Sequence, residues 1–128
     1  MKRGGVLNPA LSHLLASTGH TDYFTVCVRG FSVPAEPERI DLALVDDIPT
    51  VLDVLAALIA EWTLDRVLIT HEMDAISPDR VAEMRALLGD VPFERVSHGQ
   101  LKRLAQTARA TVRTGDTVPY ANIIVVSG

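Results

Sequence analysis

Four histidines are the side chains of this sequence best suited to proton transfer, because only imidazole titrates near neutral pH without help from its surroundings: His13, His20, His71 and His98. His20 follows a glycine that ends a helical pattern, within the sequence Gly-His-Thr-Asp. His98 follows a serine placed three residues before a glutamine, the spacing of a capping box, which predicts a helix N-terminus there. Both could belong to an acid–base site. A solvent-exposed turn or helix position is the alternative for each.

The other two histidines give weaker signals. His13 lies inside a predicted helix, where we expect it on the surface or at the edge of the core. His71 follows an apolar strand pattern and is expected in a loop, at the strand end where α/β sheets usually place ligand-binding groups. It begins the sequence His-Glu-Met-Asp-Ala, which lacks the second histidine of an H-E-x-x-H zinc motif. We therefore expect no metal site, and no glycine-rich nucleotide motif is present.

A tyrosine and an asparagine precede the last apolar segment, in Pro119-Tyr-Ala-Asn122. Side chains two residues apart in a strand share a face, so Tyr120 and Asn122 should point the same way. A phenol and an amide on one face offer donors, acceptors and a flat apolar ring, which suits a sugar. Ordinary polarity at the start of a strand is the alternative. These residues indicate a polar site that contains histidine, and they name no substrate.

Length and composition restrict the class of protein. A chain of 128 residues and 13.9 kDa fits one domain over residues 1–128. The formal net charge of -4, with acids and bases interspersed, argues against a nucleic acid partner. The longest uninterrupted apolar run covers residues 54–60, far below the roughly 20 residues that a membrane helix needs. We expect a cytoplasmic protein whose single cysteine, Cys27, is buried in an apolar strand.

Strand and helix patterns alternate along the chain and predict the scaffold that must position these side chains. Asn8-Pro9 predicts a helix that ends near Gly19, and the segments at Thr50, Ser77 and Ser97 predict the starts of three more. Strand patterns cover residues 23–28, 39–45, 66–70, 93–97, 109–113 and 121–127. This alternation predicts a three-layer α/β/α sandwich around a largely parallel mixed sheet.

The sequence resembles the D-ribose pyranase (RbsD) family, of the RbsD/FucU sugar mutarotase superfamily. The motifs that carry the resemblance occur in order over nearly the whole chain: Lys2-Arg-Gly-Gly-Val-Leu-Asn8, Gly19-His-Thr-Asp22, Arg39-Ile-Asp-Leu-Ala-Leu44, His98, Arg113-Thr-Gly115 and Pro119-Tyr-Ala-Asn122. L-Fucose mutarotases also have a Tyr-Ala-Asn segment, whereas Gly-His-Thr-Asp and Arg-Thr-Gly favour the ribose branch.

The resemblance implies an isomerase that interconverts the pyranose and furanose forms of D-ribose and uses no cofactor or metal. It implies that His20 is the proton donor and that His98, Tyr120, Ala121 and Asn122 contact the sugar. It also implies a homodecamer of two pentameric rings with sites at subunit boundaries. The expected partners are a monosaccharide and other copies of the chain, without nucleic acid or membrane.

One position departs from the family pattern. The family has a sugar-contacting aspartate eight residues after the histidine, where this chain has Val28, which cannot accept a hydrogen bond. Asp22, Asp46 or Glu72 could supply a substitute carboxylate. Two alternatives to ribose pyranase therefore stay open: a non-catalytic sugar-binding or assembly paralogue, and a mutarotase for a different sugar such as L-fucose.

Overall fold

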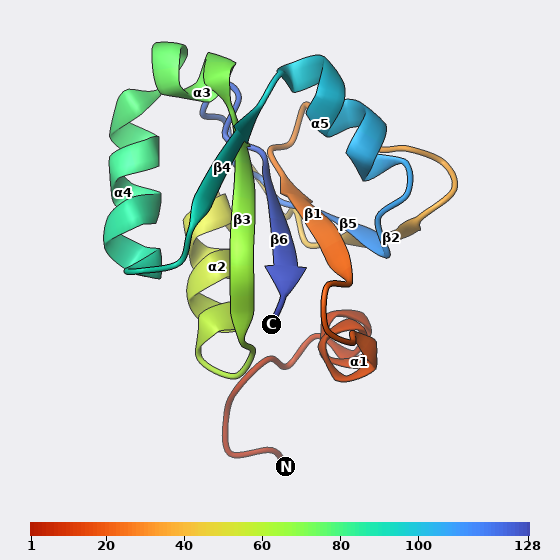
Figure 1. The fold of residues 1–128 in the computed structure, drawn as a ribbon. Helices are drawn as coiled ribbons and strands as arrows, with labels where there is room; N and C mark the ends of the chain where they lie inside the picture. Colours follow the sequence, from red (N-terminus) through yellow and green to blue (C-terminus); the bar gives the residue numbers. More distant parts are fainter.

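Six strands form one mixed sheet in the computed structural model, which describes residues 1–128 (Figure 1). The strands are β1 (Tyr23–Cys27), β2 (Glu38–Asp41), β3 (Leu64–Thr70), β4 (Phe93–Val96), β5 (Ala110–Arg113) and β6 (Ile123–Ser127), in the spatial order β2-β5-β1-β6-β3-β4. Only β6 is antiparallel to its neighbours, β1 and β3, and the other pairs are parallel. The start of β6 therefore lies beside the ends of β1 and β3, which brings three chain segments together at one edge.

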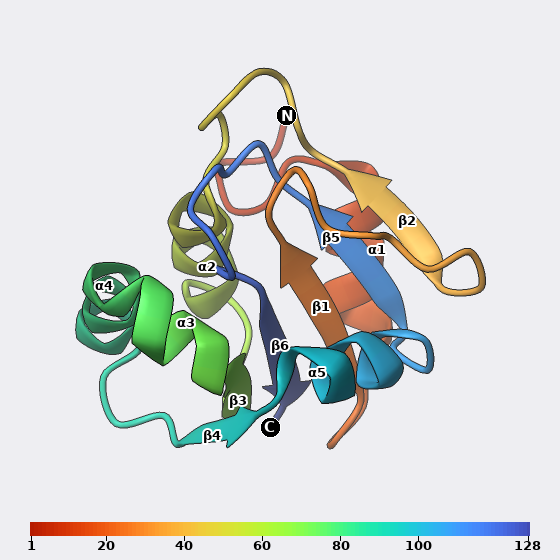
Figure 2. The same cartoon turned by 90° about the horizontal axis from the view of Figure 1, so that it is seen from above.

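Helices cover both faces of the sheet, so the predicted three-layer α/β/α sandwich is confirmed (Figures 1 and 2). The helices are α1 (Pro9–Ser17), α2 (Val51–Ile59), α3 (His71–Ile76), α4 (Pro78–Leu88) and α5 (His98–Ala105). Side chains of β1 alternate between two apolar clusters: Phe24 and Val26 pack with α1, α2 and α4, whereas Cys27 packs with Leu101 of α5. Burial raises the pKa of the Cys27 thiol to about 12. The predicted burial of this cysteine is confirmed.

Local signals at the helix starts are mostly confirmed. Asn8 caps α1 by accepting the backbone N–H of Leu11, and Thr50 with Asp53 forms a complete capping box at α2. Ser77, in contrast, makes no capping hydrogen bond at α4, because its hydroxyl donates to a backbone carbonyl in a distant loop. Helix starts are predictable where the cap is local to the sequence.

Two predicted segments differ from the structure. The strand expected over residues 39–45 ends at Asp41, because Leu44 and Val45 donate their N–H groups to Ile48 within a tight turn instead of extending the ladder. The loop expected at His71 is the first turn of α3, where the Thr70 hydroxyl accepts the backbone N–H three residues later. Both differences arise from hydrogen bonds over three or four residues that strand periodicity does not report.

A buried carboxylate joins the sheet edge to two helices. Asp116 is completely buried, and its Oδ2 accepts the N–H of Val51 at the start of α2 (2.9 Å) and a guanidinium N–H of Arg80 on α4. Its Oδ1 accepts the N–H of Val118 (3.0 Å), and its backbone carbonyl accepts the N–H of Arg29 just after β1 (3.0 Å). One residue therefore fixes the loop before β6 against both helices and β1.

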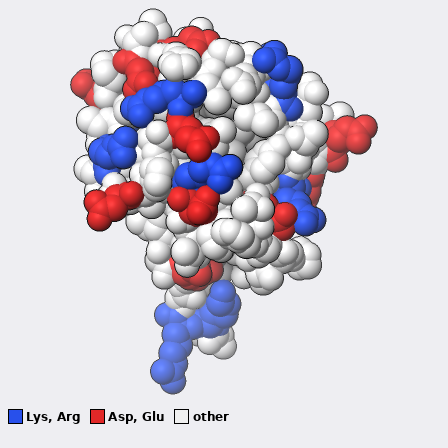
Figure 3. Space-filling model, in the orientation of Figure 1, with Lys and Arg blue, Asp and Glu red and all other residues white.

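The surface carries charges of both signs. On the face in Figure 3, acidic and basic side chains are interspersed over the body of the molecule, as the sequence predicted. None of the helices combines the length and the apolar character that crossing a membrane requires.

The Arg80–Asp116 pair gives a prediction for stability. Arg80→Met removes the cation and leaves a buried carboxylate uncompensated, so we expect the free energy of unfolding to fall by about 3–5 kcal/mol. Glu83→Gln is the matched control, because it removes the exposed partner of the same arginine (3.4 Å) and should cost less than about 1 kcal/mol. Urea unfolding at one protein concentration measures both, and equal losses would contradict the role given to Asp116.

Candidate active site

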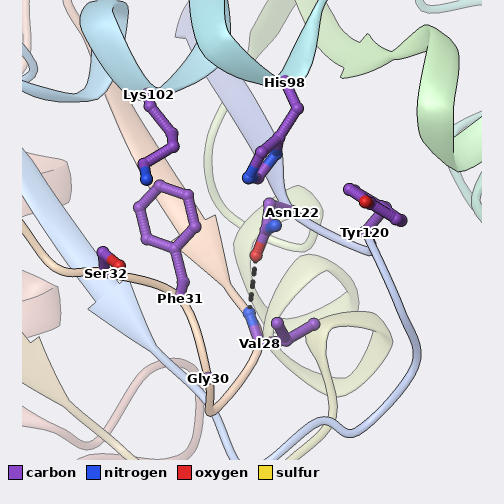
Figure 4. Close-up of a pocket in the computed structure, with 8 residues that line it drawn as sticks. All are labelled: Val28, Gly30, Phe31, Ser32, His98, Lys102, Tyr120 and Asn122. Atoms are coloured by element: carbon purple, nitrogen blue, oxygen red, sulfur yellow. Dashed lines mark hydrogen bonds between the residues drawn. The ribbon is translucent and has the colours of Figure 1, made fainter.

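A cavity of about 250 Å³ opens at the sheet edge where β1 and β3 end (Figure 4). Three segments line it: the turn after β1, the first two turns of α5, and the loop that leads into β6. The lining residues are Val28, Gly30, Phe31, Ser32, His98, Lys102, Tyr120 and Asn122. The structure thus brings together four of the residues singled out from the sequence, Val28, His98, Tyr120 and Asn122, which are separated by up to 94 positions in the chain.

His98 is held between two aromatic rings. It opens α5 after Ser97, whose hydroxyl accepts the N–H of Gln100 (3.1 Å) as the sequence predicted. The imidazole meets Phe31 and Tyr120 edge-on, with ring centroids 6.4 and 5.2 Å away. Its Nδ1 is buried without a hydrogen-bond partner. The ring therefore has an unused polar position, and buried polar atoms normally find a partner.

Asn122 is oriented by the backbone of β1. Its Oδ1 accepts the N–H of Val28 at 2.9 Å, shown by the dashed line in Figure 4, and the residue is almost fully buried. Because the oxygen is committed to this bond, the NH₂ group is the part of the side chain left to donate to a ligand. The amide thus presents a fixed donor to the cavity.

Tyr120 reaches the cavity from a turn and not from a strand. Its φ is +59°, in the left-handed region that few residues other than glycine adopt, and β6 begins only at Ile123. Tyr120 and Asn122 do line one cavity, but the strand alternation expected from the sequence is not the reason. Ala121 between them is fully buried in the larger apolar cluster, so its side chain lies outside the cavity.

Four lining residues were not predicted from the sequence. Gly30, Phe31 and Ser32 follow β1 at its carboxyl end, a position typical of ligand-binding loops in α/β sheets. Lys102 lies four residues after His98, on the same face of α5, and this spacing was a signal available in the sequence (Figure 4). It is the only lining residue with a permanent charge, and it makes no ion pair within the chain.

The three candidate substitutes for the family aspartate are placed differently. Asp22 lies at the start of β1, where the N–H of Gly19 lowers its pKa, and Asp46 forms an exposed ion pair with Arg29 (2.9 Å). Glu72 alone contacts a lining residue: its Oε2 accepts the backbone N–H of His98 at 2.9 Å, and this bond lowers the pKa of the Glu72 carboxyl.

His20 does not lie at this cavity in the single chain. It is exposed in the turn before β1, whereas the cavity lies beyond the other end of that strand. The six steps from Asp22 to Val28 alone span about 20 Å at the usual strand rise of about 3.3 Å per residue. His13 and His71 are exposed on α1 and α3, and neither lines the cavity.

The site presents donors, acceptors and aromatic edges of the kind that bind a polyhydroxylated ligand. The imidazole and the ammonium come from α5, the phenol and the amide NH₂ come from the loop before β6, and Val28 and Phe31 supply apolar surface. No group of three or more His, Cys, Asp or Glu side chains is gathered closely enough to hold a metal ion.

Curated relatives cover the whole chain. A D-ribose pyranase from Geobacillus thermodenitrificans (strain NG80-2) is 42% identical over 128 residues, which span 100% of this chain and 97% of the relative. A D-ribose pyranase from Chloroflexus aggregans (strain MD-66 / DSM 9485) is 44% identical, with 100% and 98% covered. These similarities extend over all the segments that line the cavity.

Solved structures show the same architecture. Bacillus subtilis RbsD, complexed with D-ribose, has a TM-score of 0.95 and 34% identity, and the match covers 100% of this chain and 98% of that one. The fucose mutarotase of Streptococcus pneumoniae, in complex with L-fucose, has a TM-score of 0.83 at 19% identity, covering 95% and 93%, and supports the fold alone. The sequence model of the RbsD / FucU transport protein family matches residues 1–128, and the chain belongs to this family.

Proposed function

We propose that this protein is a cytoplasmic D-ribose pyranase, which interconverts the pyranose and furanose forms of the sugar. The observation that carries the proposal is the convergence of His98, Tyr120 and Asn122 on one cavity, in a chain that matches a ribose-complexed structure over its whole length. Relatives named D-ribose pyranase support this activity over the non-catalytic alternative. The fucose mutarotase is far more distant in sequence.

The reaction consists of proton transfers between oxygen atoms. One group removes the proton of the anomeric hydroxyl while another protonates the ring oxygen, and the C–O bond of the hemiacetal breaks to give the open aldehyde. A different hydroxyl of the chain then attacks the aldehyde and the transfers run in reverse. A histidine can serve as acid in one half and base in the other, typically contributing about 10²–10⁴-fold.

The residues of the cavity are suited to binding the sugar. The NH₂ group of Asn122 can donate to a hydroxyl, and the imidazole of His98 and the phenol of Tyr120 can each donate or accept. Lys102 adds a cationic donor from α5. Because the amide is already fixed by Val28, little side-chain freedom is lost when the sugar binds.

In this proposal the proton donor His20 comes from a second copy of the chain. The separation of His20 from the cavity by the length of β1 supports this arrangement, as does its exposure. The surface also carries large apolar side chains that an assembly would cover, namely Leu7, Leu44, Val45, Ile48 and Ile76, each more than half exposed. We propose the homodecamer of two pentameric rings as the assembly.

The shared site predicts complementation between two inactive variants. His20→Ala removes the donor and Asn122→Ala damages the cavity, so we expect each alone to lose about 10²-fold or more of the ribose exchange rate. Co-assembled in equal amounts, they should recover about one quarter of wild-type exchange, because about one site in four then combines an intact histidine with an intact cavity. NMR exchange spectroscopy of the anomeric protons measures the rate.

The control for complementation is co-assembly of His20→Ala with the double variant His20→Ala/Asn122→Ala. Neither chain in that mixture carries His20, so no recovery is expected. Recovery there, or none in the first mixture, would refute a site shared between chains.

Val28 gives a second prediction. Val28→Asp places a carboxylate in the cavity beside Asn122, where it can bind a sugar hydroxyl, and should raise kcat/KM for ribose by about tenfold or more, the scale of one charged hydrogen bond. Val28→Asn is the uncharged control and should gain less. An unchanged or lower rate in Val28→Asp would mean that the cavity is built around a different ligand.

A further inference from the structure

The start of α5 is fixed by a carboxylate from another helix. Glu72 lies in α3, directly after β3, and its Oε2 accepts the N–H of His98 at 2.9 Å. The strands that precede these helices, β3 and β4, are parallel neighbours, so α3 and α5 begin at the same sheet edge (Figure 1). Two residues 26 positions apart are joined there by one hydrogen bond.

This hydrogen bond gives the first N–H group of α5 an acceptor, which the helix itself does not provide. The first N–H groups of an α-helix have no acceptor within the helix. Ser97 accepts the N–H of Gln100, and Glu72 accepts that of His98, so the two side chains divide the exposed donors between them. The bond from His98 lowers the pKa of the Glu72 carboxyl.

Glu72 is also unusual among the acidic residues of the chain. Among the hydrogen bonds and ion pairs of the eight lining residues, its carboxylate is the only acidic acceptor. The titratable groups whose charge acts on the Glu72 carboxylate are the His98 imidazole on α5 and His71 on its own helix. Asp74, on the same short helix, instead pairs with Arg95 of β4 at 2.8 Å.

We propose that Glu72 is a positioning residue for sugar binding, which acts by holding the backbone of His98 so that the imidazole stays in place between Phe31 and Tyr120. The inference rests on the proposed ribose activity. It assigns Glu72 no contact with the sugar and no proton transfer. The role requires only that the Oε2 atom of Glu72 lies within hydrogen-bonding distance of the backbone N–H of His98.

Two conservative variants separate the effect of the position of the Glu72 side-chain oxygen from the effect of its charge. Glu72→Gln keeps an oxygen at the same distance from the His98 N–H and loses the charge, so KM for ribose should stay within about threefold of wild type. Glu72→Asp keeps the charge but withdraws the oxygen by one methylene, so KM should rise about tenfold. In both variants kcat should change by less than about threefold, because the proposed proton donor, His20, is untouched.

The matched control is Asp74→Ala, which breaks the neighbouring ion pair of the same helix without reaching the cavity, and its KM should equal that of wild type. A general loosening of α3 would raise KM in this variant as well, and that result would overturn the proposal. So would the reverse order, with Glu72→Gln more impaired than Glu72→Asp. A fall in kcat with KM unchanged would indicate a smaller folded fraction and would also count against positioning.

A readout without ribose keeps this test separate from the proposed function. In protein labelled at histidine, the ring resonances of His98 should shift in Glu72→Asp and change little in Glu72→Gln or Asp74→Ala. Absence of ribose exchange in the wild type would refute the pyranase proposal and leave this comparison intact. Unchanged His98 resonances in Glu72→Asp would refute the positioning role whatever the exchange rate.

Discussion

The arrangement of this molecule depends on the buried carboxylate of Asp116. An ionised side chain with no exposure to water is strongly destabilising unless it is paired and its lone pairs are occupied. Asp116 meets this requirement with one guanidinium, from Arg80, and two backbone N–H groups, from Val51 and Val118. Those partners belong to α4, α2 and the loop before β6, so all three must be in place together. The need to satisfy one charge therefore fixes the loop that carries Tyr120 and Asn122.

The same loop has a backbone conformation that would not persist unsupported. A non-glycine residue at positive φ, as Tyr120 is, costs on the order of 1–3 kcal/mol and needs surrounding contacts to hold it. The Ser77 hydroxyl, which donates to the carbonyl of Pro119 at 2.6 Å, holds the residue before it, and the Asn122–Val28 bond holds the segment after it. The phenol is thus directed beside His98 by contacts on both sides, so the cavity is shaped before a ligand arrives.

The sequence predicted the features whose causes are local. Caps such as Asn8 and Thr50 act within three residues, and apolar strand patterns gave the layers, so both were predictable. Tyr120 and Asn122 were correctly expected to face one side, but the cause is a turn held by Asp116 and Ser77. The contact between Glu72 and His98 was not predictable, because it depends on β3 and β4 being adjacent, and spatial strand order is not encoded in local periodicity.

The length of β1 sets a limit on how this family member can work. His20 precedes the strand and Val28 follows it, and the hydrogen bonds of β1 with both β5 and β6 make it a central strand that side-chain rotation cannot shorten. If His20 supplies the proton, the two halves of the site can meet only across a contact between chains. Assembly is then a condition of catalysis as well as of stability, and the active fraction follows the population of assembled chains. The proposed sugar-binding cavity is formed within one chain, and the proposed proton donor is exposed at the opposite end of β1, as that division requires.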